Sequence, residues 1–329
     1  MYQLKQIPED FIVIESLDLT PSEGNYYYFE LKKTNLTTNY AIKLIAEQIR
    51  VPIKNISYAG NKDKQAITTQ IISIKSYNNL SSLSLDEESL TLTYLSKGDH
   101  PISLGDLNSN YFEITIRNIS KLPVLQDHFP NYFDEQRFSK NNSVIGKLLI
   151  KKDFKKAAEL LRENNHLSLT NNLEKNPTNY VGAITSISRK ILMIYLHSYQ
   201  SKLFNEILSS HIKENYAYKS SEFNFGELSF TNQSDDKEFP LIGFDTDTNK
   251  EISAILQKEN LTSRDFIIRQ LPNLSLEGTT RNAFVKVNKL SLSELQEDEL
   301  NKGMKKCKLS FQLPPGSYAT MFIKTILNN

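Results

Sequence analysis

The sequence predicts an α+β fold, in which a largely antiparallel sheet is combined with helices. Short β-branched and aromatic runs occupy most of the first half, apolar residues recur at helical spacing after about Ser143, and a strand-like run returns near the end. Strands grouped in one part of a chain and helices in another are typical of α+β proteins. A length of 329 residues fits one large domain or two ordinary ones, and 39% hydrophobic residues supply a core.

Alternating or β-branched runs predict the strands of the first half. These runs are Phe11–Glu15, Tyr26–Leu31, Ile56–Ala59, Ile67–Ile74, Thr91–Leu95 and Tyr111–Ile116. Turn residues separate the first two runs, so we expect them to form a hairpin. Between the second and third runs, Asn39 to Arg50 carries apolar residues on one stripe after Thr37, which predicts an amphipathic helix that ends before Pro52.

Helical spacing dominates the second half. Val144 to Glu163 reads as helix with a break near Asp153, a residue type suited to the N-cap of the second piece. From Arg189 to Ile212, apolar residues recur at intervals of four and three, which predicts a long helix with a buried face. The remaining predicted segments are polar loops over Thr170–Asn179 and Ser220–Lys237, a strand over Lys308–Gln312, and a terminal helix over Ala319–Leu327.

Composition and motifs exclude several classes of protein. Lys plus Arg number 39 and Asp plus Glu 38, so the net charge of +1 excludes a globally basic coat but not a local basic surface. The single Cys307 excludes a disulfide framework and a cysteine-based metal site. The five histidines form no zinc motif, and Asp245-x-Asp247-x-Asn249 lacks the later residues of a calcium loop. Neither nucleotide-binding glycine motifs nor a GxSxG elbow occur. We therefore expect no metal and no cofactor.

The N-terminus has no apolar signal-like region, and the most apolar stretch, Ile191–Leu196, is far shorter than the ~20 residues that span a bilayer. These features predict a cytoplasmic protein without a membrane segment.

Two polar segments are candidates for chemistry, and each has an ordinary alternative. Ser57–Gln70 is either a charged hairpin turn or a segment in which Asp63, between two lysines, is kept ionised and nucleophilic. Pro130–Phe138 is either a loop anchored by buried aromatics or a surface on which rings, an amide and a guanidinium hold a base and a phosphate. The residues alone leave both alternatives open.

Five blocks in order, from about Lys5 to Leu327, resemble the TruD family, the tRNA pseudouridine synthases D. In this sequence the blocks are Pro8-Glu-Asp-Phe-Ile-Val13 with Glu15, Gly60-x-Lys-Asp-Lys-x-Ala-x-Thr-x-Gln70, Asn131-Tyr-Phe-x-x-Gln-Arg-Phe138, Gln200-Ser-x-x-Phe-Asn205 and Leu313-Pro-x-Gly-Ser-Tyr-Ala-Thr320. The sequence departs from the family at Asp134 and Ser139, where glycine is usual, and at Tyr318, where phenylalanine is usual.

The resemblance implies an isomerase that converts uridine to pseudouridine, characteristically uridine 13 in the D arm of tRNA, with no cofactor or metal. It identifies Asp63 as the essential aspartate. The target base must leave its stack before the Asp63 carboxylate can reach it. It places Lys5 near the site, as a charge partner of Asp63 or of a phosphate. The residues expected to bind the substrate are Phe11, Asn131, Tyr318, Phe133, Lys5, Lys62 and Arg137. The expected partner is tRNA in its D-arm region, with no membrane and no obligate protein partner.

The resemblance also implies a domain plan. A pseudouridine-synthase catalytic domain with a mixed, largely antiparallel sheet comprises residues 1–155 and 282–329, and an α/β TRUD insertion domain comprises 156–281. Binding of tRNA by a nearly neutral chain requires a local basic surface. Its candidates are two lysine runs, at positions 147, 151, 152, 155 and 156 and at positions 302, 305, 306 and 308.

Three other functions stay open. One is an RNA-binding protein of the same fold without catalysis, and another is a pseudouridine synthase that acts on a different RNA. The third, an unrelated α+β hydrolase, requires a nucleophile–base pair that the sequence does not show.

Overall fold

The computed structural model describes residues 2–328. The chain separates into two compact units: unit 1 comprises Met1–Pro123 and Lys286–Gly316, and unit 2 comprises Val124–Val285 and Ser317–Asn329. The chain therefore builds most of unit 1, then most of unit 2, returns to unit 1 and ends in unit 2. Both predicted boundaries of the insertion domain, 155/156 and 281/282, fall within unit 2. They stay a prediction, because compactness does not show which segment is an insertion.

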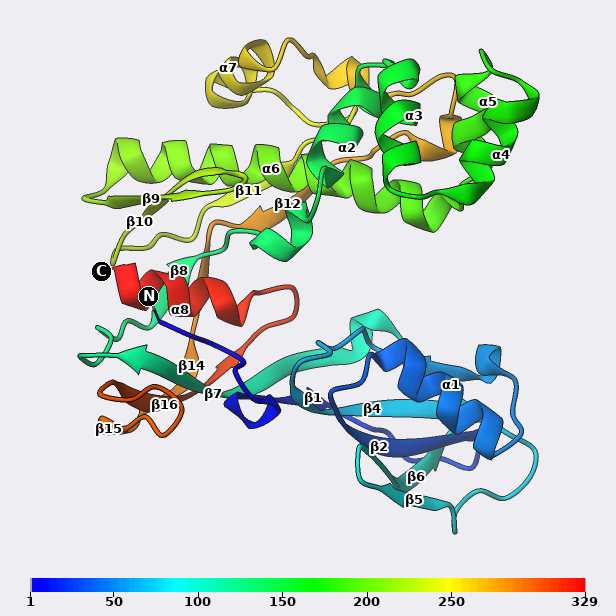
Figure 1. Cartoon of the computed structure of the whole chain (residues 1–329), viewed down its shortest axis with the longest axis vertical. Helices are drawn as coiled ribbons and strands as arrows, with labels where there is room; N and C mark the ends of the chain where they lie inside the picture. The colour runs from blue at the N-terminus through cyan, green and yellow to red at the C-terminus, as the bar shows by residue number, and fades with distance from the viewer. Residues whose placement is uncertain (1, 329) are drawn as a thin grey trace. The chain divides into compact units, whose positions relative to one another are not determined.

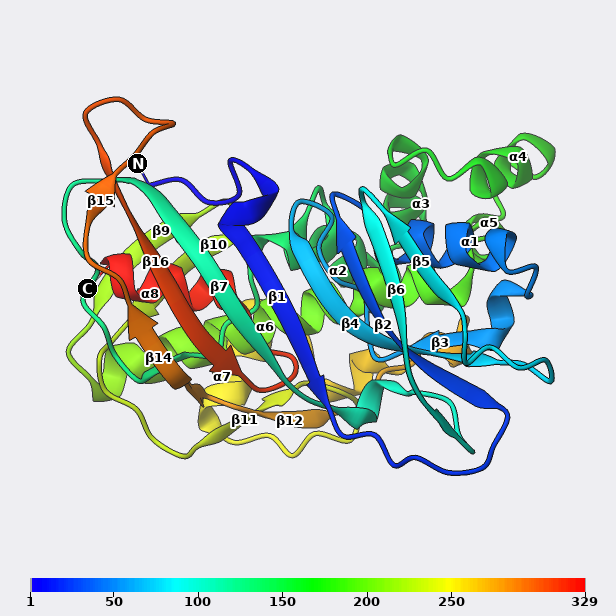
Figure 2. The same ribbon diagram turned by 90° about the horizontal axis from the view of Figure 1, so that it is seen from below.

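A ten-stranded mixed sheet forms the framework of unit 1 (Figures 1 and 2). Its order is β14-β16-β7-β1-β4-β2-β6-β5, with β15 beside β16 and β3 beside β4. β1 and β4 are parallel, and their other neighbours pair antiparallel. The predicted α+β fold with a large mixed sheet is thereby confirmed. The strands are β1 Phe11–Leu17, β2 Tyr26–Thr34, β3 Ile56–Tyr58, β4 Ile67–Lys75, β5 Ser84–Glu87, β6 Leu90–Gly98, β7 Leu107–Ile119, β14 Asn288–Leu292, β15 Gln296–Glu297 and β16 Lys305–Leu313.

The predicted hairpin of the first two strands is wrong. β4 lies between β1 and β2, with Ile12 beside Ile67 on one edge and Leu31 beside Gln70 on the other. An alternating pattern indicates which face of a strand is buried, but it does not name the neighbouring strand. β4 pairs with both strands, and its Ile72 is fully buried, as expected for the centre of a sheet.

Helix α1, Thr38–Gln48, covers one face of this sheet. The predicted start is confirmed, because Thr37 Oγ1 accepts a hydrogen bond from Tyr40 N at 3.2 Å. Ile42 and Ile45 are buried in the same apolar cluster as Phe29 and other sheet residues. Burying each such side chain stabilises the fold by about 1.5–3 kcal/mol. Three short 3-10 helices complete unit 1: η1 Pro8–Asp10, η2 Ile53–Asn55 and η3 Leu104–Asp106.

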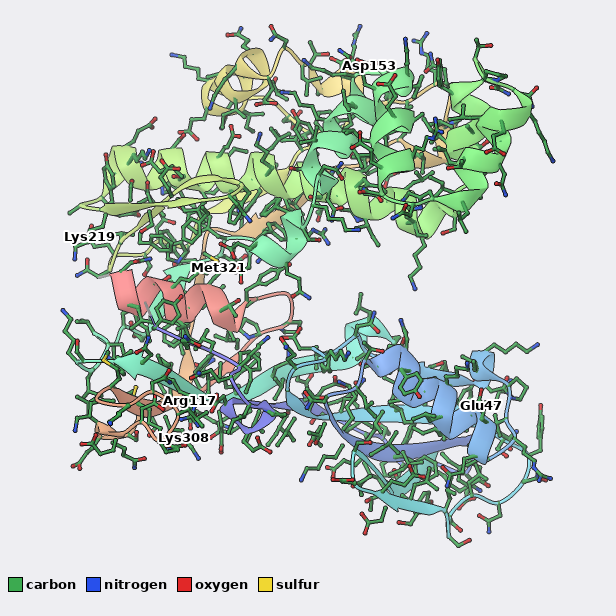
Figure 3. The ribbon with its side chains drawn as sticks, viewed as in Figure 1. Glu47, Arg117, Asp153, Lys219, Lys308 and Met321 are labelled. Carbon is green, nitrogen blue, oxygen red and sulfur yellow. The ribbon has the colours of Figure 1, made fainter. Side chains whose placement is uncertain are left out.

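A buried arginine joins three separate segments of unit 1. Arg117 on β7, labelled in Figure 3, donates from Nε to Asp10 Oδ1 at 2.8 Å and from Nη1 to Asp298 Oδ1 at 2.9 Å. Nη1 also donates to Glu299 Oε1 at 3.0 Å. Asp10 belongs to η1, and the other two acids follow β15. The N-terminal segment and the returning segment are therefore held to the same strand.

Unit 2 is organised around the 27-residue helix α6, Arg189–Asn215, whose predicted buried face is confirmed by Leu203 and Ile207 (Figure 1). The helix α2, Asn142–Ile150, and the strands β10 and β11 pack against it. The other elements are α3 Phe154–Glu163, α4 Leu167–Lys175, α5 Tyr180–Thr185, α7 Lys250–Lys258, α8 Ala319–Asn328, η4 Glu135–Phe138, η5 Ser263–Phe266, η6 Pro272–Leu274, β8 His128–Pro130, β9 Lys219–Phe223, β10 Gly226–Phe230, β11 Glu238–Leu241, β12 Thr279–Asn282 and β13 Phe284–Lys286.

Two segments predicted as loops are ordered elements. Thr170–Asn179 overlaps α4, which buries little more than Leu169, and Ser220–Lys237 overlaps the β9–β10 hairpin. Both have polar sequences because only a few of their residues face the interior. The predicted break at Asp153 is confirmed, because its Oδ1 accepts a hydrogen bond from Lys156 N at the start of α3.

None of the helices in residues 2–328 combines the length and the apolar character needed to cross a membrane.

Candidate active site

Asp63 lies on the loop between β3 and β4, and its carboxylate has a partner that is distant in sequence. Lys5 Nζ donates to Asp63 Oδ2 at 2.6 Å, and the same ammonium lies 4.0 Å from the centroid of the Phe11 ring. The Asp63 side chain is 32% exposed, so solvent and ligands can reach it. The structure therefore brings together three of the predicted site residues, Lys5, Phe11 and Asp63.

Lys62 does not hold the Asp63 carboxylate, although it precedes it in sequence. Its ammonium lies 2.5 Å from Glu15 Oε2 on β1 and donates to Asn110 Oδ1 on β7 at 3.0 Å. The side chains of Lys62 and Glu15 are 9% and 0% exposed, so this is a buried ion pair. The interpretation that two flanking lysines hold the Asp63 carboxylate is thus corrected: the ammonium in contact is that of Lys5. Lys62 attaches the loop to the sheet instead.

Buried polar side chains fix the main chain of the loop. Lys62 N donates to Thr38 Oγ1 at 2.9 Å, and Thr38 Oγ1 donates to Gln70 Oε1 at 3.0 Å. Gln70 Nε2 in turn donates to Gly60 O at 3.3 Å. Thr38 and Gln70 are almost fully buried. A loop restrained by side chains inside the core presents its own residues with little freedom.

Lys33 is a third buried contact of this loop, and the sequence analysis did not identify it. Its Nζ donates to Asp63 O at 2.9 Å and to Leu36 O at 2.6 Å. A signal was present in the sequence. Phe29, Leu31 and Lys33 alternate along β2, so the alternation that buries the two apolar residues also directs Lys33 into the core.

In unit 2, Phe133 is at the centre of an aromatic group. Its ring meets Phe204 edge-on at 5.6 Å and Tyr318 edge-on at 6.0 Å between centroids. Asn205 on α6 accepts from Phe133 N and donates to Phe133 O, both at 2.9 Å. The block Gln200–Asn205 therefore positions Phe133: Phe204 packs against its ring and Asn205 fixes its main chain.

Asn131 is buried, and both ends of its amide have protein partners. Nδ2 donates to Asn282 O at 2.9 Å, and Oδ1 accepts from Arg281 Nη2 at 2.5 Å. An amide has two donor hydrogens and two acceptor lone pairs. Asn131 thus keeps capacity for one further hydrogen bond of each kind. The sequence analysis missed Arg281, because only the fold brings it beside Asn131.

Two guanidinium groups border the Phe133 ring. The Arg281 guanidinium lies 4.2 Å and the Arg137 guanidinium 5.6 Å from its centroid. Arg137 Nε also donates to Ser201 Oγ at 3.1 Å. Burial lowers the pKa of the Arg137 guanidinium. Burial also lowers the pKa of Arg281, to about 10; the nearby Tyr318 raises that pKa, and the nearby Arg137 lowers it. Both remain charged at neutral pH, so unit 2 has a positive, aromatic-rich region.

The two departures from family glycines cause no backbone strain. Asp134 has φ −89° and Ser139 has φ −48°, both in regions open to any residue. Asp134 makes contacts that a glycine at this position cannot make. Its carboxylate accepts from Thr320 Oγ1 and, at 2.6 Å, from Lys324 Nζ, both on α8.

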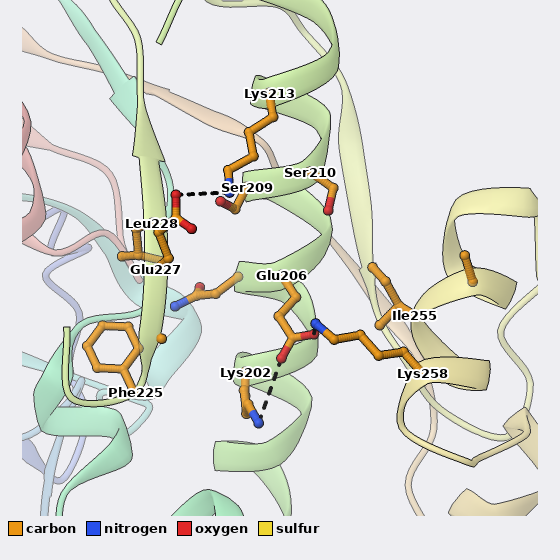
Figure 4. Close-up of a pocket in the computed structure, with 13 residues that line it drawn as sticks. Lys202, Glu206, Ser209, Ser210, Lys213, Phe225, Glu227, Leu228, Ile255 and Lys258 are labelled. Carbon is orange, nitrogen blue, oxygen red and sulfur yellow. Dashed lines mark ion pairs between the residues drawn. The ribbon is translucent and has the colours of Figure 1, made fainter. Parts of the chain in front are cut away.

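A cavity of about 500 Å³ in unit 2 lies among α6, the β9–β10 hairpin and α7, and Figure 4 shows its ion pairs. Lys202 and Lys258 lie 3.7 and 3.5 Å from Glu206, and Lys213 lies 3.0 Å from Glu227. Lys202 and Lys258 share Glu206, and Lys213 has Glu227, so the three lysines and two glutamates of the lining leave one positive charge in excess. Across residues 2–328, no cluster of three or more His, Cys, Asp or Glu side chains could hold a metal ion. Cys307 is buried, which raises the pKa of its thiol to about 11 and leaves it protonated.

Within residues 2–328, only some lysines of the two runs lack a carboxylate partner and are available to bind phosphates. Among the described residues, five of their nine members form ion pairs with carboxylates: Lys147 with Glu259, Lys152 with Asp265, Lys156 with Asp153, Lys305 with Glu297 and Lys306 with Glu299. The other four have no such partner there: Lys151, Lys155, Lys302 and Lys308.

Comparisons with known proteins agree with this fold. The family model described as tRNA pseudouridine synthase D (TruD) matches residues 2–168, 162–233 and 237–326. The chain is 33% identical to the probable tRNA pseudouridine synthase D of Nanoarchaeum equitans over 98% of both chains. It is 30% identical to the tRNA pseudouridine synthase D of Aquifex aeolicus, over 98% of this chain and 97% of that one. A Methanosarcina mazei structure, provisionally named tRNA pseudouridine synthase D, superimposes with a TM-score of 0.76 at 26% identity, over 99% of this chain and 93% of that chain.

These matches define a pseudouridine synthase that acts on tRNA, an isomerase. Within that class, the chain belongs to the TruD family, tRNA pseudouridine synthase D.

Proposed function

We propose that this isomerase converts uridine 13 in the D arm of tRNA to pseudouridine and that Asp63 is its catalytic carboxylate. The observation that carries the proposal is the Lys5–Asp63 pair at 2.6 Å, on a loop whose main chain is fixed by buried side chains. Lys5 compensates the charge of Asp63, and partial exposure leaves the carboxylate accessible. Uridine 13 is the target that the resemblance implies.

The reaction needs a fixed carboxylate and no outside reagent. The N1–C1′ bond breaks, the uracil turns, a C5–C1′ bond forms, C5 loses a proton and N1 gains one. Substrate and product are isomers, so no electrons are exchanged. An ionised carboxylate near C1′ and C6 can add to the target or remove a sugar proton, and both roles require rigid placement.

We further propose that Asn131, Phe133, Arg137 and Tyr318 of unit 2 bind the RNA. The rings offer stacking faces, worth about 1–3 kcal/mol per base, against an unstacking cost of a few kcal/mol. Asn131 has a donor and an acceptor available for the uracil edge. Arg137, beside the Phe133 ring, suits a phosphate.

The test is Asp63→Asn, which is close in shape but lacks the charge. We expect it to abolish pseudouridine formation in a single turnover with excess enzyme on a tRNA transcript, while tRNA binding and thermal stability stay near those of the parent. Asp63→Glu should also fail, because moving the carboxylate by roughly 1 Å costs on the order of 100-fold in rate. Mapping pseudouridine on the transcript checks the position. An Asn variant as fast as the parent would make Asp63 a turn residue.

A further inference from the structure

Lys33 carries an amine into the interior of unit 1. It is 0% exposed, and both acceptors of its Nζ are main-chain carbonyls, those of Leu36 and Asp63. Lysine is almost never fully buried without an opposite charge beside it. Among the described residues, no carboxylate lies within ion-pair distance of this ammonium. The position of Lys33 is therefore unusual and requires a reason.

Stability alone does not supply that reason. Burial lowers the pKa of Lys33 to about 8, nearby Asp63 raises it, and Lys62 lowers it further. Carbonyl groups can be satisfied by a neutral donor or an ordered water, without the cost of burying a charge. What lysine adds at this place is a positive charge next to the main chain of Asp63.

We propose that Lys33 is a positioning residue for Asp63: its amine fixes the main chain at the aspartate, and its charge adds to the field that Lys5 provides at the carboxylate. This inference rests on the proposed catalytic role of Asp63. Lys33 acts through Asp63 and does not touch the uridine, because its hydrogen bond goes to the carbonyl and it is fully buried. Small displacements matter here, since about 1 Å of misplacement costs on the order of 100-fold in rate.

The charge on Lys33 responds to few other groups. The titratable groups that act on it are Asp63 and Lys62, both on the β3–β4 loop. Beside it in the sheet lie Thr68 on β4 and Leu90 on β6, which do not titrate. Loss of the Lys33 proton above about pH 8 should therefore weaken the field at Asp63 and slow the chemical step.

The experiment compares Lys33→Met with Lys32→Met in the full chain. Lys32 is the adjacent residue on the opposite, exposed face of β2, so the same substitution there leaves the core intact. The readouts are the single-turnover rate on a tRNA transcript and the Kd for tRNA, both measured across pH. We expect Lys33→Met to lower the rate about 100-fold at neutral pH, to leave Kd unchanged, and to lack the decline that the parent shows near pH 8. Lys32→Met should keep the parent's rate and pH profile.

Two outcomes would overturn the inference. The first is a folded Lys33→Met variant that reacts as fast as the parent, and the second is a rate for the parent that does not decline near pH 8. The second outcome is measured on the parent alone, so the inference can still be tested if the Lys33→Met protein does not fold. Asp63→Asn separates the two proposals: an active Asn variant contradicts the role of Asp63, whereas an inactive one with a fast Lys33→Met contradicts only the role of Lys33.

Discussion

The hydroxyl of Tyr318 has no hydrogen-bond partner within residues 2–328, whereas its ring meets Phe133 edge-on at 6.0 Å. Tyr318→Phe should therefore leave single-turnover activity almost unchanged. Tyr318→Ala removes the ring and should cost about 1–3 kcal/mol of stabilisation of the target base. The measurement is the single-turnover rate with enzyme in excess over the tRNA transcript but below its Kd, with thermal stability as the control. Equal activity of the Ala variant and the parent would assign the ring to the core.

Lys33 also predicts a pH dependence of stability. Its pKa is about 8 in the folded chain and higher when unfolded, so the unfolded chain binds this proton more tightly. The cost of burying the charge is therefore full below pH 8 and disappears as the pH rises toward the unfolded value, about 10.4. The free energy of unfolding of the parent, relative to Lys33→Met, should rise by up to about 3 kcal/mol over this window. Urea unfolding at both ends measures it, and a constant difference contradicts it.

Between elements, Asp134 joins η4 to α8 through Thr320 and Lys324. Asp134→Ala should lower the free energy of unfolding by about 1–3 kcal/mol, because the partly buried Thr320 and Lys324 lose a charged acceptor. The matched control is Glu135→Ala. Glu135 is also near Lys324, at 3.6 Å, but its side chain is 47% exposed, so its loss should cost at most about 1 kcal/mol. Equal effects of the two substitutions in urea unfolding would show that Asp134 is not the link.

The ion pairs of Arg117 predict how the stability of unit 1 changes at low pH. Burial raises the pKa of Asp298, but hydrogen bonds from Asn118 N, Asn301, Leu300 N and Arg117 outweigh it and lower the pKa to about 2. A depressed carboxyl pKa stabilises the fold above the unfolded value, and this contribution is lost as pH falls from about 4 to about 2. Asp298→Asn should therefore flatten the loss of stability over that range.

At neutral pH, Asp298→Asn should also destabilise unit 1 by about 1–3 kcal/mol, because Arg117, Asn118 N and Leu300 N lose a charged acceptor while Arg117 keeps Asp10 and Glu299. Urea unfolding between pH 2 and pH 7 measures both effects. A variant with the parent's acid profile would show that Asp298 does not control acid unfolding.

The sequence predicted elements where one residue pattern was sufficient. Periodicity identified β1, β2, β4, α1 and α6, because each buries a continuous face. It did not identify α4 or the β9–β10 hairpin, since these depend on neighbours for their few buried contacts. Strand pairing failed for a related reason: the residues that separate β1 from β2 do not reveal that β4 lies between them. Local patterns define faces, and distant segments decide partners.

At the scale of the whole chain, the same limit applies to the candidate site. The loop sequence identified Asp63, but its ammonium partner Lys5 is 58 residues away, and no spacing rule connects them. Only the resemblance to a family selected Lys5 beforehand. Arg281, 150 residues from Asn131, escaped both kinds of reasoning. Lys33 could have been identified from the β2 pattern alone, because it is a charged residue that alternates in step with buried apolar residues.

A net charge of +1 means that tRNA binding depends on local lysines, and the structure separates them into two kinds. Lysines paired with carboxylates are less available to phosphates than unpaired ones. Two variants of equal charge change test this difference. One replaces unpaired lysines by glutamine: Lys151, Lys155, Lys302 and Lys308. The other replaces paired lysines by glutamine: Lys152, Lys156, Lys305 and Lys306.

The readout is the slope of log K for tRNA binding against log salt concentration. Each lost phosphate contact should lower its magnitude by about one unit, so the unpaired variant should show a clearly smaller slope than the parent. The paired variant carries the same added negative charge and shares any long-range repulsion, so a difference between the two isolates direct contacts. We expect the paired variant to keep most of the parent's slope. Equal slopes in the parent and the unpaired variant would remove these four lysines from the RNA-binding surface.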